Sequence, residues 1–214
     1  YATKPERDPT GLGRWCSMLI KSGNKAVRIV VAYRPHKYGR GWRQGQGKGA
    51  GSVWRQHRRY FRGIGREGSP RQLFDKDLLA AIHSWKVKGD EIILAGDFNE
   101  NIYTSDFAKA LGHRDVGLIE QYQKLYDERA PYSHYSGTEP IMTIYATAGV
   151  QVTAAFLSQH KVKGVVGDHR LQVFDIATVS LTGIDEPTIT RAEGRNLQCR
   201  NYSAKVRYVK VLQQ

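Results

Sequence analysis

The stretch Glu91–Glu100, EIILAGDFNE, decides the fold. Its apolar run over 92–95 is unbroken, which predicts a strand that is covered on both faces. Gly96 ends the run, and because it has no Cβ, another backbone or a phosphate can approach it closely. The segment therefore predicts a buried strand that delivers polar groups at its carboxyl end.

Two polar residues follow that glycine, with a phenylalanine between them. Side chains two positions apart share a face of an extended segment, so Asp97 and Asn99 are expected to project together while Phe98 turns into the core. A carboxylate beside an amide can seat a water molecule or a hydrated Mg²⁺. The alternative is a strand followed by an Asx-turn, in which both residues serve the backbone.

A second stretch has a similar form. Gly167-Asp168-His169-Arg170 precedes another apolar run, 171–176, so an aspartate again follows a glycine and a histidine comes next. Adjacent side chains on a strand point to opposite faces, so one of the pair must lie in the loop. An isolated Asp-His pair in a surface loop is the alternative reading.

The two stretches together resemble the endonuclease/exonuclease/phosphatase superfamily, which has a Gly-Asp-x-Asn strand end and a terminal Asp-His. The segment Val31–Pro35, an apolar strand that ends in Tyr-x-Pro, fits a third signature, and the three occur in the family's order. The resemblance covers about residues 12–180. It implies an α/β fold, the DNase I-like αββα sandwich with mixed, largely antiparallel sheets, which is expected to be incomplete at its N-terminus in this chain.

The resemblance also implies roles for individual residues in metal-assisted hydrolysis of a phosphodiester. Asp97 would orient or deprotonate the attacking water, and Asn99 would hold that water or the phosphate. Tyr33 would donate a hydrogen bond to the phosphate, Asp168 would help to bind Mg²⁺ or Mn²⁺, and His169 would face the phosphate. Mg²⁺ prefers oxygen ligands, which makes the imidazole a better partner for the phosphate than for the metal.

Two departures from the family pattern lower the expected activity. The family has a metal-binding Asn and Glu in an N-terminal half, and nothing upstream of Tyr33 matches them; the chain begins at Tyr1, so an upstream segment or a partner chain could supply them. The family also has an aspartate that supports the catalytic histidine, and Met142 occupies the matching place. Without that carboxylate the His169 ring is less well oriented, so we expect weak or absent activity in this chain alone.

A narrower resemblance rests on three further segments. Gly11–Trp15, Val53–His57 and Pro70–Phe74 are similar to endonuclease-type domains in transposable-element-like proteins of algae. From the superfamily resemblance, residues 1–181 are expected to form a partial endonuclease/exonuclease/phosphatase domain, and 182–214 a basic C-terminal extension.

Composition points to a polyanionic partner. The 214 residues suit one domain with its own core, and the formal net charge is +13. Cys16 and Cys199 are far apart, which favours a reducing compartment over a disulfide framework. We therefore expect an intracellular protein, nuclear or organellar if it is eukaryotic. No apolar run approaches the length of about 20 residues that spans a membrane, so no membrane partner is expected.

The segment 34–66 concentrates that charge and has no acidic residue. Glycine-rich 39–51 reads as a mobile loop, and 52–64 as a helix that Ser52 caps. Arginine suits phosphates and aromatic rings stack on bases, so we expect this segment to bind DNA or RNA, with a solvated basic face as the alternative. The expected contacts are Arg34, Arg40, Trp42, Arg43, Arg55, Arg58, Arg59 and Arg62.

The rest of the chain predicts alternating strands and helices. A hairpin is expected from 15–20 and 27–33, and a helix begins with a Ser69–Gln72 capping box. Short helices are expected over 105–111 and 118–125. Strands are expected over 141–146, 150–157 and 171–181, the last with Val173 and Phe174 inside.

Three functions remain open from the sequence. The first is a metal-dependent endonuclease, with a mobile element as one setting. The second is a non-catalytic nucleic-acid-binding module, with a ribonucleoprotein as one setting. The third is a relative that acts on a small phosphorylated substrate or lipid head group, which the long basic segment disfavours.

Overall fold

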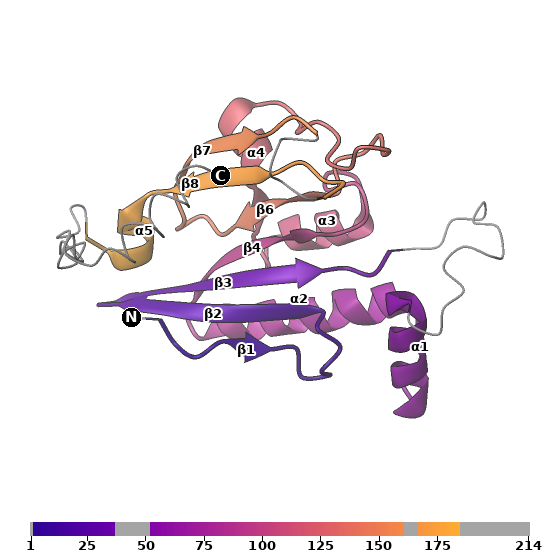
Figure 1. Ribbon diagram of the computed structural model, residues 1–214. Helices are drawn as coiled ribbons and strands as arrows, with labels where there is room; N and C mark the ends of the chain where they lie inside the picture. The colour runs from indigo at the N-terminus through magenta and orange to yellow at the C-terminus, as the bar shows by residue number, and fades with distance from the viewer. Residues whose placement is uncertain (1, 37–51, 161–166, 185–214) are drawn as a thin grey trace, which may run out of the picture.

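The structure, a computed structural model, describes residues 2–36, 52–160 and 167–184 (Figure 1). The larger sheet contains six strands and the smaller sheet two. The strands are β1 Glu6–Arg7, β2 Trp15–Ser22, β3 Lys25–Tyr33, β4 Glu91–Asp97, β5 Ile119–Glu120, β6 Met142–Ala146, β7 Val152–Leu157 and β8 Gln172–Ile176. The helices are α1 Val53–Gly63, α2 Pro70–Val87, α3 Asp106–Gly112, α4 Gln121–Tyr126 and α5 Thr178–Thr182.

The larger sheet has the order β1-β2-β3-β4-β6-β5. Its strand pairs are antiparallel except β3 and β4, which run parallel because the chain crosses from one to the other through α1 and α2. The smaller sheet is the antiparallel pair β7 and β8. This mixed, largely antiparallel α/β architecture is the one that the sequence predicts.

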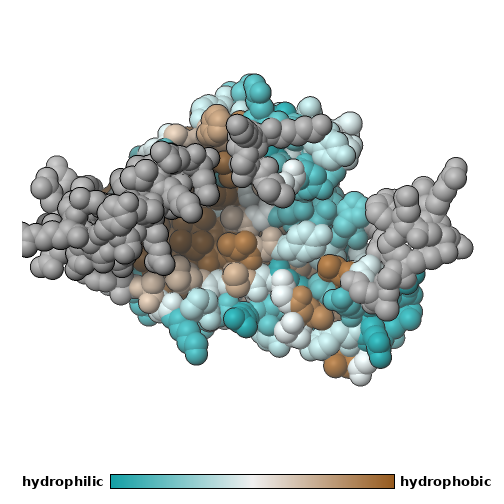
Figure 2. Space-filling model, viewed as in Figure 1, coloured by the Kyte–Doolittle hydropathy of each residue, from teal (hydrophilic) through white to brown (hydrophobic). Residues whose placement is uncertain are grey.

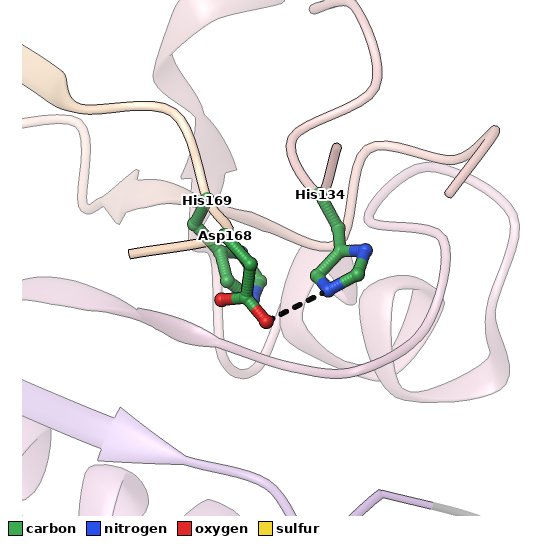
Figure 3. Close-up of side chains that lie close together, drawn as sticks. All are labelled: His134, Asp168 and His169. Atoms are coloured by element: carbon green, nitrogen blue, oxygen red, sulfur yellow. Dashed lines mark hydrogen bonds and ion pairs between the residues drawn. The ribbon is translucent and has the colours of Figure 1, made fainter. Parts of the chain in front are cut away.

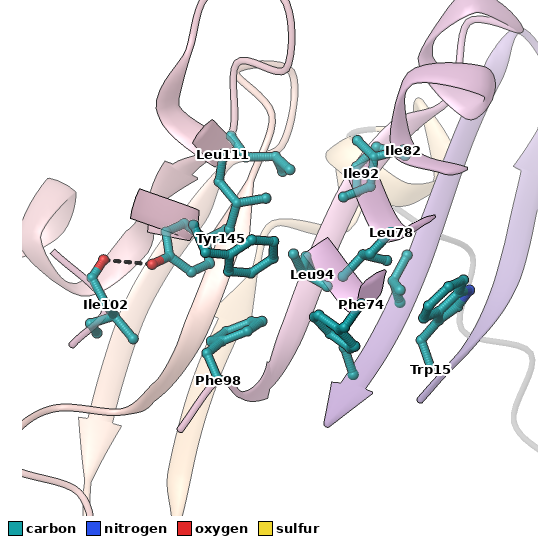
Figure 4. Close-up of a cluster of buried hydrophobic side chains, with 14 of the residues drawn as sticks. Trp15, Phe74, Leu78, Ile82, Ile92, Leu94, Phe98, Ile102, Leu111 and Tyr145 are labelled. Atoms are coloured by element: carbon teal, nitrogen blue, oxygen red, sulfur yellow. Dashed lines mark hydrogen bonds between the residues drawn. The ribbon is translucent and has the colours of Figure 1, made fainter. Parts of the chain in front are cut away.

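The main core lies between α2 and the larger sheet (Figure 4). Phe74, Leu78 and Ile82 come from the buried stripe of α2 and are fully buried. They pack with Ile92 and Leu94 of β4, whose side chains alternate with those of the opposite face. Burying a large apolar side chain contributes about 1.5–3 kcal/mol, so this stripe fixes the helix against the strand that delivers the site.

A second core lies between the two sheets. Ile29 of β3 and Ile93 of β4 face it, and Phe174 of β8 and Leu181 of α5 pack against them. Figure 2 shows apolar side chains gathered in a hollow on the viewed face, between the layer of β3 and that of β7 and β8. The smaller sheet is therefore held over the face of β3 and β4 whose carboxyl ends carry Tyr33 and Asp97.

Both long helices begin where their sequences predict. Ser52 caps α1, and its hydroxyl accepts a hydrogen bond from the Arg55 N–H. Ser69 and Gln72 form the expected capping box of α2. On α1 only His57 and Phe61 are buried, so the expected core face of this helix is narrower than its apolar pattern suggests.

Two elements near the end of the chain differ from expectation. The strand predicted over 171–181 ends at Ile176, and the chain turns into α5. Val173 is 44% exposed, because it lies on the face of β8 opposite to the one that packs on the larger sheet. The helix predicted over 118–125 is a strand followed by α4. The described ranges contain no helix long and apolar enough to cross a membrane.

Candidate active site

One row of paired residues crosses the larger sheet at the carboxyl ends of β3 and β4. Tyr33 is opposite Asp97 in the parallel ladder, and Asp97 is opposite Met142 in the antiparallel one. Directly paired residues on neighbouring strands share a face, so these three side chains stand on one edge of the sheet. Their face is the one that β8 covers.

Gly96 makes that edge possible. A Cβ at this position would collide with the carbonyl oxygen of Ala32 in the neighbouring strand, so the close approach expected at this glycine is confirmed and is made by backbone. Phe98 is 2% exposed and packs in the main core, as the alternation predicts.

The extended conformation does not continue to Asn99. Its φ of 52° is left-handed, and its N–H donates a hydrogen bond to Asp97 Oδ1 over 2.9 Å. This is the Asx-turn alternative, which asparagine tolerates because its short polar side chain bonds locally. Asp97 and Asn99 nevertheless line the same cavity, so the turn brings them together in place of strand alternation.

The Asn99 side chain is held by the loop that follows β3. Its Nδ2 donates to the Arg34 carbonyl oxygen over 2.8 Å, and its Oδ1 lies 3.2 Å from His36 Nδ1. The Arg71 guanidinium of α2 donates to the carbonyl oxygens of both Pro35 and Asn99. The loop that follows Tyr33 and the turn that carries Asn99 are therefore tied to each other and to α2.

Asp168 and His169 reach this edge from the loop before β8 (Figure 3). His169 Nε2 lies 3.8 Å from Asp97 Oδ2 and 3.8 Å from Asp168 Oδ1. The two stretches that sequence analysis singled out thus converge, although 71 positions separate Asp97 from Asp168.

A second histidine, His134, completes the cluster. His134 Nε2 lies 3.1 Å from Asp168 Oδ2, and its ring stands edge-on to that of His169 with centroids 5.0 Å apart (Figure 3). The Ser136 N–H donates to His134 Nδ1 over 3.3 Å. A neutral His134 therefore carries its proton on Nε2 and donates it to Asp168.

These residues surround a cavity of about 1000 Å³. Its described lining includes all five catalytic and metal-binding candidates from the sequence, which are Tyr33, Asp97, Asn99, Asp168 and His169. It also includes His36, Trp54 and His134, which the sequence did not assign to the site. His134 lies in a polar loop that carries no motif, and it reaches the site through a bridge to His169, a residue far along the chain.

The two aspartates have opposite pKa shifts. Burial raises the pKa of Asp97, although the hydrogen bond from the Asn99 N–H opposes that shift. The hydrogen bond from His134 lowers the pKa of Asp168. Asp168 is therefore the more strongly ionised carboxylate, and Asp97 is the one shifted toward the range of a general base.

The donor set fits a hard divalent cation. His134, Asp168 and His169 offer ligand atoms within 4.8 Å of one another. The Nε2 proton of His134 points at Asp168, however, so the carboxylate of Asp168 is the better donor of this cluster. Mg²⁺ is commonly held by one or two carboxylates and water, so Asp168 and water ligands fit such an ion.

The His169 ring lacks the support that the family resemblance implies. Its Nδ1 is buried and has no hydrogen-bond partner among the described residues. Met142, which stands opposite Asp97, carries no carboxylate that could hold that nitrogen.

The basic segment divides into three parts. Arg55, Arg58, Arg59 and Arg62 are exposed on α1. Arg40, Trp42 and Arg43 lie outside the described residues. Arg34 differs from expectation: it is 4% exposed, and ion pairs with Asp75 and Glu100 occupy its guanidinium. It therefore stabilises the fold in place of the predicted contact with nucleic acid.

The comparisons with known proteins agree with this architecture. Among solved structures, the chain is similar to the 3′ phosphatase NExo from Neisseria bound to a product DNA hairpin, with 12% identity over 82% of this chain and 71% of that one, and a TM-score of 0.55. It is also similar to an AP endonuclease from Archaeoglobus fulgidus, with 11% identity, the same coverage of both chains and a TM-score of 0.52. No protein-family model and no curated protein matches the sequence.

The chain covers less of a third matched structure. The chain spans about half the length of the human Nocturnin catalytic domain, 52% of that chain and 76% of this one, at 18% identity and a TM-score of 0.47. The similarity to NExo and to the AP endonuclease establishes the fold: this chain has the DNase I-like fold of endonuclease/exonuclease/phosphatase proteins.

Proposed function

We propose that the chain binds nucleic acid and hydrolyses a phosphodiester bond in it with the help of a divalent metal ion. The observation that carries this proposal is the convergence of Tyr33, Asp97, Asn99, Asp168 and His169 on one cavity. The fold that the chain shares with the 3′ phosphatase and the AP endonuclease supports the same reaction class.

Asp97 is the residue that acts on the attacking water. Its Oδ1 is engaged by the Asn99 N–H, which leaves Oδ2 directed toward His169 and the cavity. Because burial raises its pKa, the carboxylate accepts a proton from water more readily than an exposed aspartate does.

The other side chains act on the phosphate. Hydrolysis concentrates negative charge on the phosphate oxygens, and donors that are already in place stabilise that charge without reorganisation. Tyr33, 43% exposed at the edge of the cavity, offers its hydroxyl. Asn99 is fixed by the Arg34 carbonyl, and His169 presents Nε2 beside both aspartates.

Asp168 is the residue that would hold the metal ion, together with water. When bound, Mg²⁺ or Mn²⁺ supplies positive charge that neutralises the phosphate oxygens and lowers the pKa of a water ligand. His134 holds the Asp168 carboxylate in its orientation and favours its ionised form.

A second candidate function is a nucleic-acid-binding module without catalysis. The observation that favours it is that the Nδ1 of His169 has no hydrogen-bond partner within the described part of the chain, since an imidazole that is not held by an acceptor is a poorly oriented donor. Under this alternative the cavity and α1 bind nucleic acid, and added metal produces no cleavage.

A nicking assay separates the two functions. Supercoiled DNA, single-stranded DNA and RNA are incubated with the chain in Mg²⁺, in Mn²⁺ and in EDTA. We expect metal-dependent cleavage that falls at least about 100-fold in Asp97→Asn, because the amide cannot accept the proton. Asp106→Asn, which changes a fully exposed aspartate on α3, is the matched control and should leave the rate unchanged. Equal cleavage by wild type and Asp97→Asn would show that the assignment is wrong.

A further inference from the structure

A second cavity adjoins the candidate active site. It has a volume of about 680 Å³, and it lies between α1 and the loop that leads into α2. Trp54 is the described residue that lines both cavities. The α1 helix lies beyond the end of the larger sheet toward which β3 points, as Figure 1 shows. The second cavity therefore continues outward from the site along α1.

The face of α1 along this cavity carries a stripe of arginine. Trp54, Arg58 and Arg62 lie at successive intervals of four residues, so they share one face of the helix. Each interval advances about 6 Å along the helix axis, which is comparable with the distance between consecutive phosphates of an extended nucleic-acid strand.

The charges of this stripe are available to a ligand. Arg58 and Arg62 are exposed, and neither forms an ion pair within the described ranges. Arg66, which lines the same cavity, is different because both of its terminal nitrogens donate to Asp77. Glu67 is the carboxylate in the described lining, so the two arginines outweigh it.

We infer that this second cavity binds the single-stranded segment that flanks the scissile phosphate. Arg58 and Arg62 contact successive phosphates, and Trp54, at the junction of the two cavities, stacks on the base next to the cleavage site. The inference rests on the proposed function for the position of the scissile phosphate. An unpaired strand is the substrate because a base in a duplex already stacks on its neighbours, whereas an unpaired base exposes a face to the indole.

The consequence is a minimum length for the substrate. A mononucleotide or a dinucleotide that fills only the first cavity gains nothing from the arginine stripe. Strands that extend from the first cavity along α1 gain one phosphate contact at each arginine, and their binding becomes more sensitive to salt.

Binding is measured first, in EDTA, so that it does not depend on catalysis. Fluorescein-labelled oligonucleotides of deoxythymidine and of uridine are prepared in a series of increasing length. The chain is titrated into each single strand, and into the longest deoxythymidine strand annealed to its complement, at several salt concentrations. We expect affinity to rise with length until both cavities are filled, and the single strands to bind more tightly than the duplex.

The variants assign the contacts. Trp54→Ala should weaken binding of the long single strand about 5- to 100-fold, and Trp54→Phe should retain most of the affinity because the aromatic face remains. Arg58→Gln and Arg62→Gln should each reduce the slope of log affinity against log salt by about 0.7. Arg114→Gln removes one exposed arginine outside both cavities and should change neither quantity beyond a small uniform loss.

The outcomes distinguish this inference from the proposed function. If metal-dependent cleavage occurs but binding does not depend on length, Trp54, Arg58 or Arg62, the proposed function stands and this inference is wrong. If the variants weaken binding as expected and no cleavage occurs, the strand-binding cavity stands and the proposed catalysis is wrong. Equal binding of the duplex, or no binding of any oligonucleotide at low salt, overturns the inference. If only deoxythymidine or only uridine oligonucleotides bind, the ligand is DNA or RNA respectively.

Discussion

Tyr33 and Asp97 are direct partners across the parallel ladder of β3 and β4, so a phenol and a carboxylate stand side by side at the end of two neighbouring strands. Both side chains line the cavity that also contains Asp168 and His169. The sheet register, rather than a flexible loop, therefore sets the spacing of two residues that the proposed reaction requires. Sites on strands are positioned more rigidly than sites on loops.

Restoring a carboxylate to the position opposite Asp97 should raise activity. Met142→Asp places a carboxylate on the row of the sheet that carries Asp97, and we expect it to accept from the Nδ1 of His169, which has no hydrogen-bond partner among the described residues. Such supporting contacts are typically worth about 10- to 100-fold in activity or metal affinity, and we expect a gain in that range in the nicking assay. Met142→Asn, of the same shape without the charge, is the control. If neither variant exceeds wild type, the missing carboxylate does not limit the reaction.

Removing His134 should make the ionised form of Asp168 less stable. The hydrogen bond from His134 lowers the pKa of Asp168, so His134→Ala should raise that pKa toward its ordinary value. The carboxylate then protonates at a higher pH, and the acidic limb of the pH–rate profile should move upward. His134→Gln, whose amide N–H can still donate, should restore part of the wild-type profile. An unchanged limb in both variants would mean that Asp168 is oriented by other groups.

The buried ion pairs of Arg14 should control stability in acid. Asp8 and Arg14 have fully buried side chains that are 2.7 Å apart, and Asp77 also accepts from Arg14. Burial alone would raise the pKa of both aspartates, but hydrogen bonds from the arginines lower it below the ordinary value of 3.8. Because the folded-state pKa is depressed, the stabilisation is complete above the unfolded-state value and is lost as the pH falls through the folded-state pKa.

Asp8→Asn tests this pair directly. It leaves the Arg14 charge buried without its main partner, which should cost about 3–5 kcal/mol in the free energy of unfolding at pH 7. Urea denaturation should show this difference shrinking below about pH 4, where the wild-type carboxylate also becomes protonated. Asp106→Asn, at a fully exposed position, should lie within about 0.5 kcal/mol of wild type throughout. A difference between Asp8→Asn and wild type that is independent of pH would rule out the charge as the cause.

Adding a methyl group at Gly96 should destabilise the fold, because the backbone of the neighbouring strand lies too close. Gly96→Ala forces a Cβ into the Ala32 carbonyl oxygen, and overpacking of this kind typically costs about 1–3 kcal/mol. Gly112→Ala is the matched control, because a Cβ there meets no atom within 4 Å and its φ is not left-handed. In thermal denaturation, we therefore expect a lower melting temperature for Gly96→Ala and an unchanged one for Gly112→Ala. Equal melting temperatures would show that the two strands can separate slightly without loss.

The sequence predicts the buried part of β4 and the buried Phe98 because both follow from the local apolar pattern, although the strand runs one residue past Gly96, to Asp97. It also predicts the convergence of Asp97, Asn99, Asp168 and His169, through family resemblance. The prediction that strand geometry joins Asp97 to Asn99 was wrong, since one left-handed residue replaces it with a turn.

Residues whose role depends on distant partners were not predictable in this way. Arg34 lies in the basic segment, but its charge is taken up by Asp75 and Glu100, which come from α2 and from the loop after β4. His134 lies in a polar loop with no pattern of its own, and only the ladder partners of β6 bring it beside His169. In both cases the decisive contact joins segments that are more than 30 positions apart.

Arg71 holds together two loops at the edge of the site without lining the cavity itself. Its guanidinium donates to the main-chain oxygens of Pro35 and Asn99, and it pairs with Glu100. A lysine cannot span two carbonyl groups with a planar fork, so even a charge-preserving exchange would release two loops at once. A mutational scan scored by activity alone would thus record position 71 as essential to the chemistry, although what that side chain governs is the alignment of its neighbours.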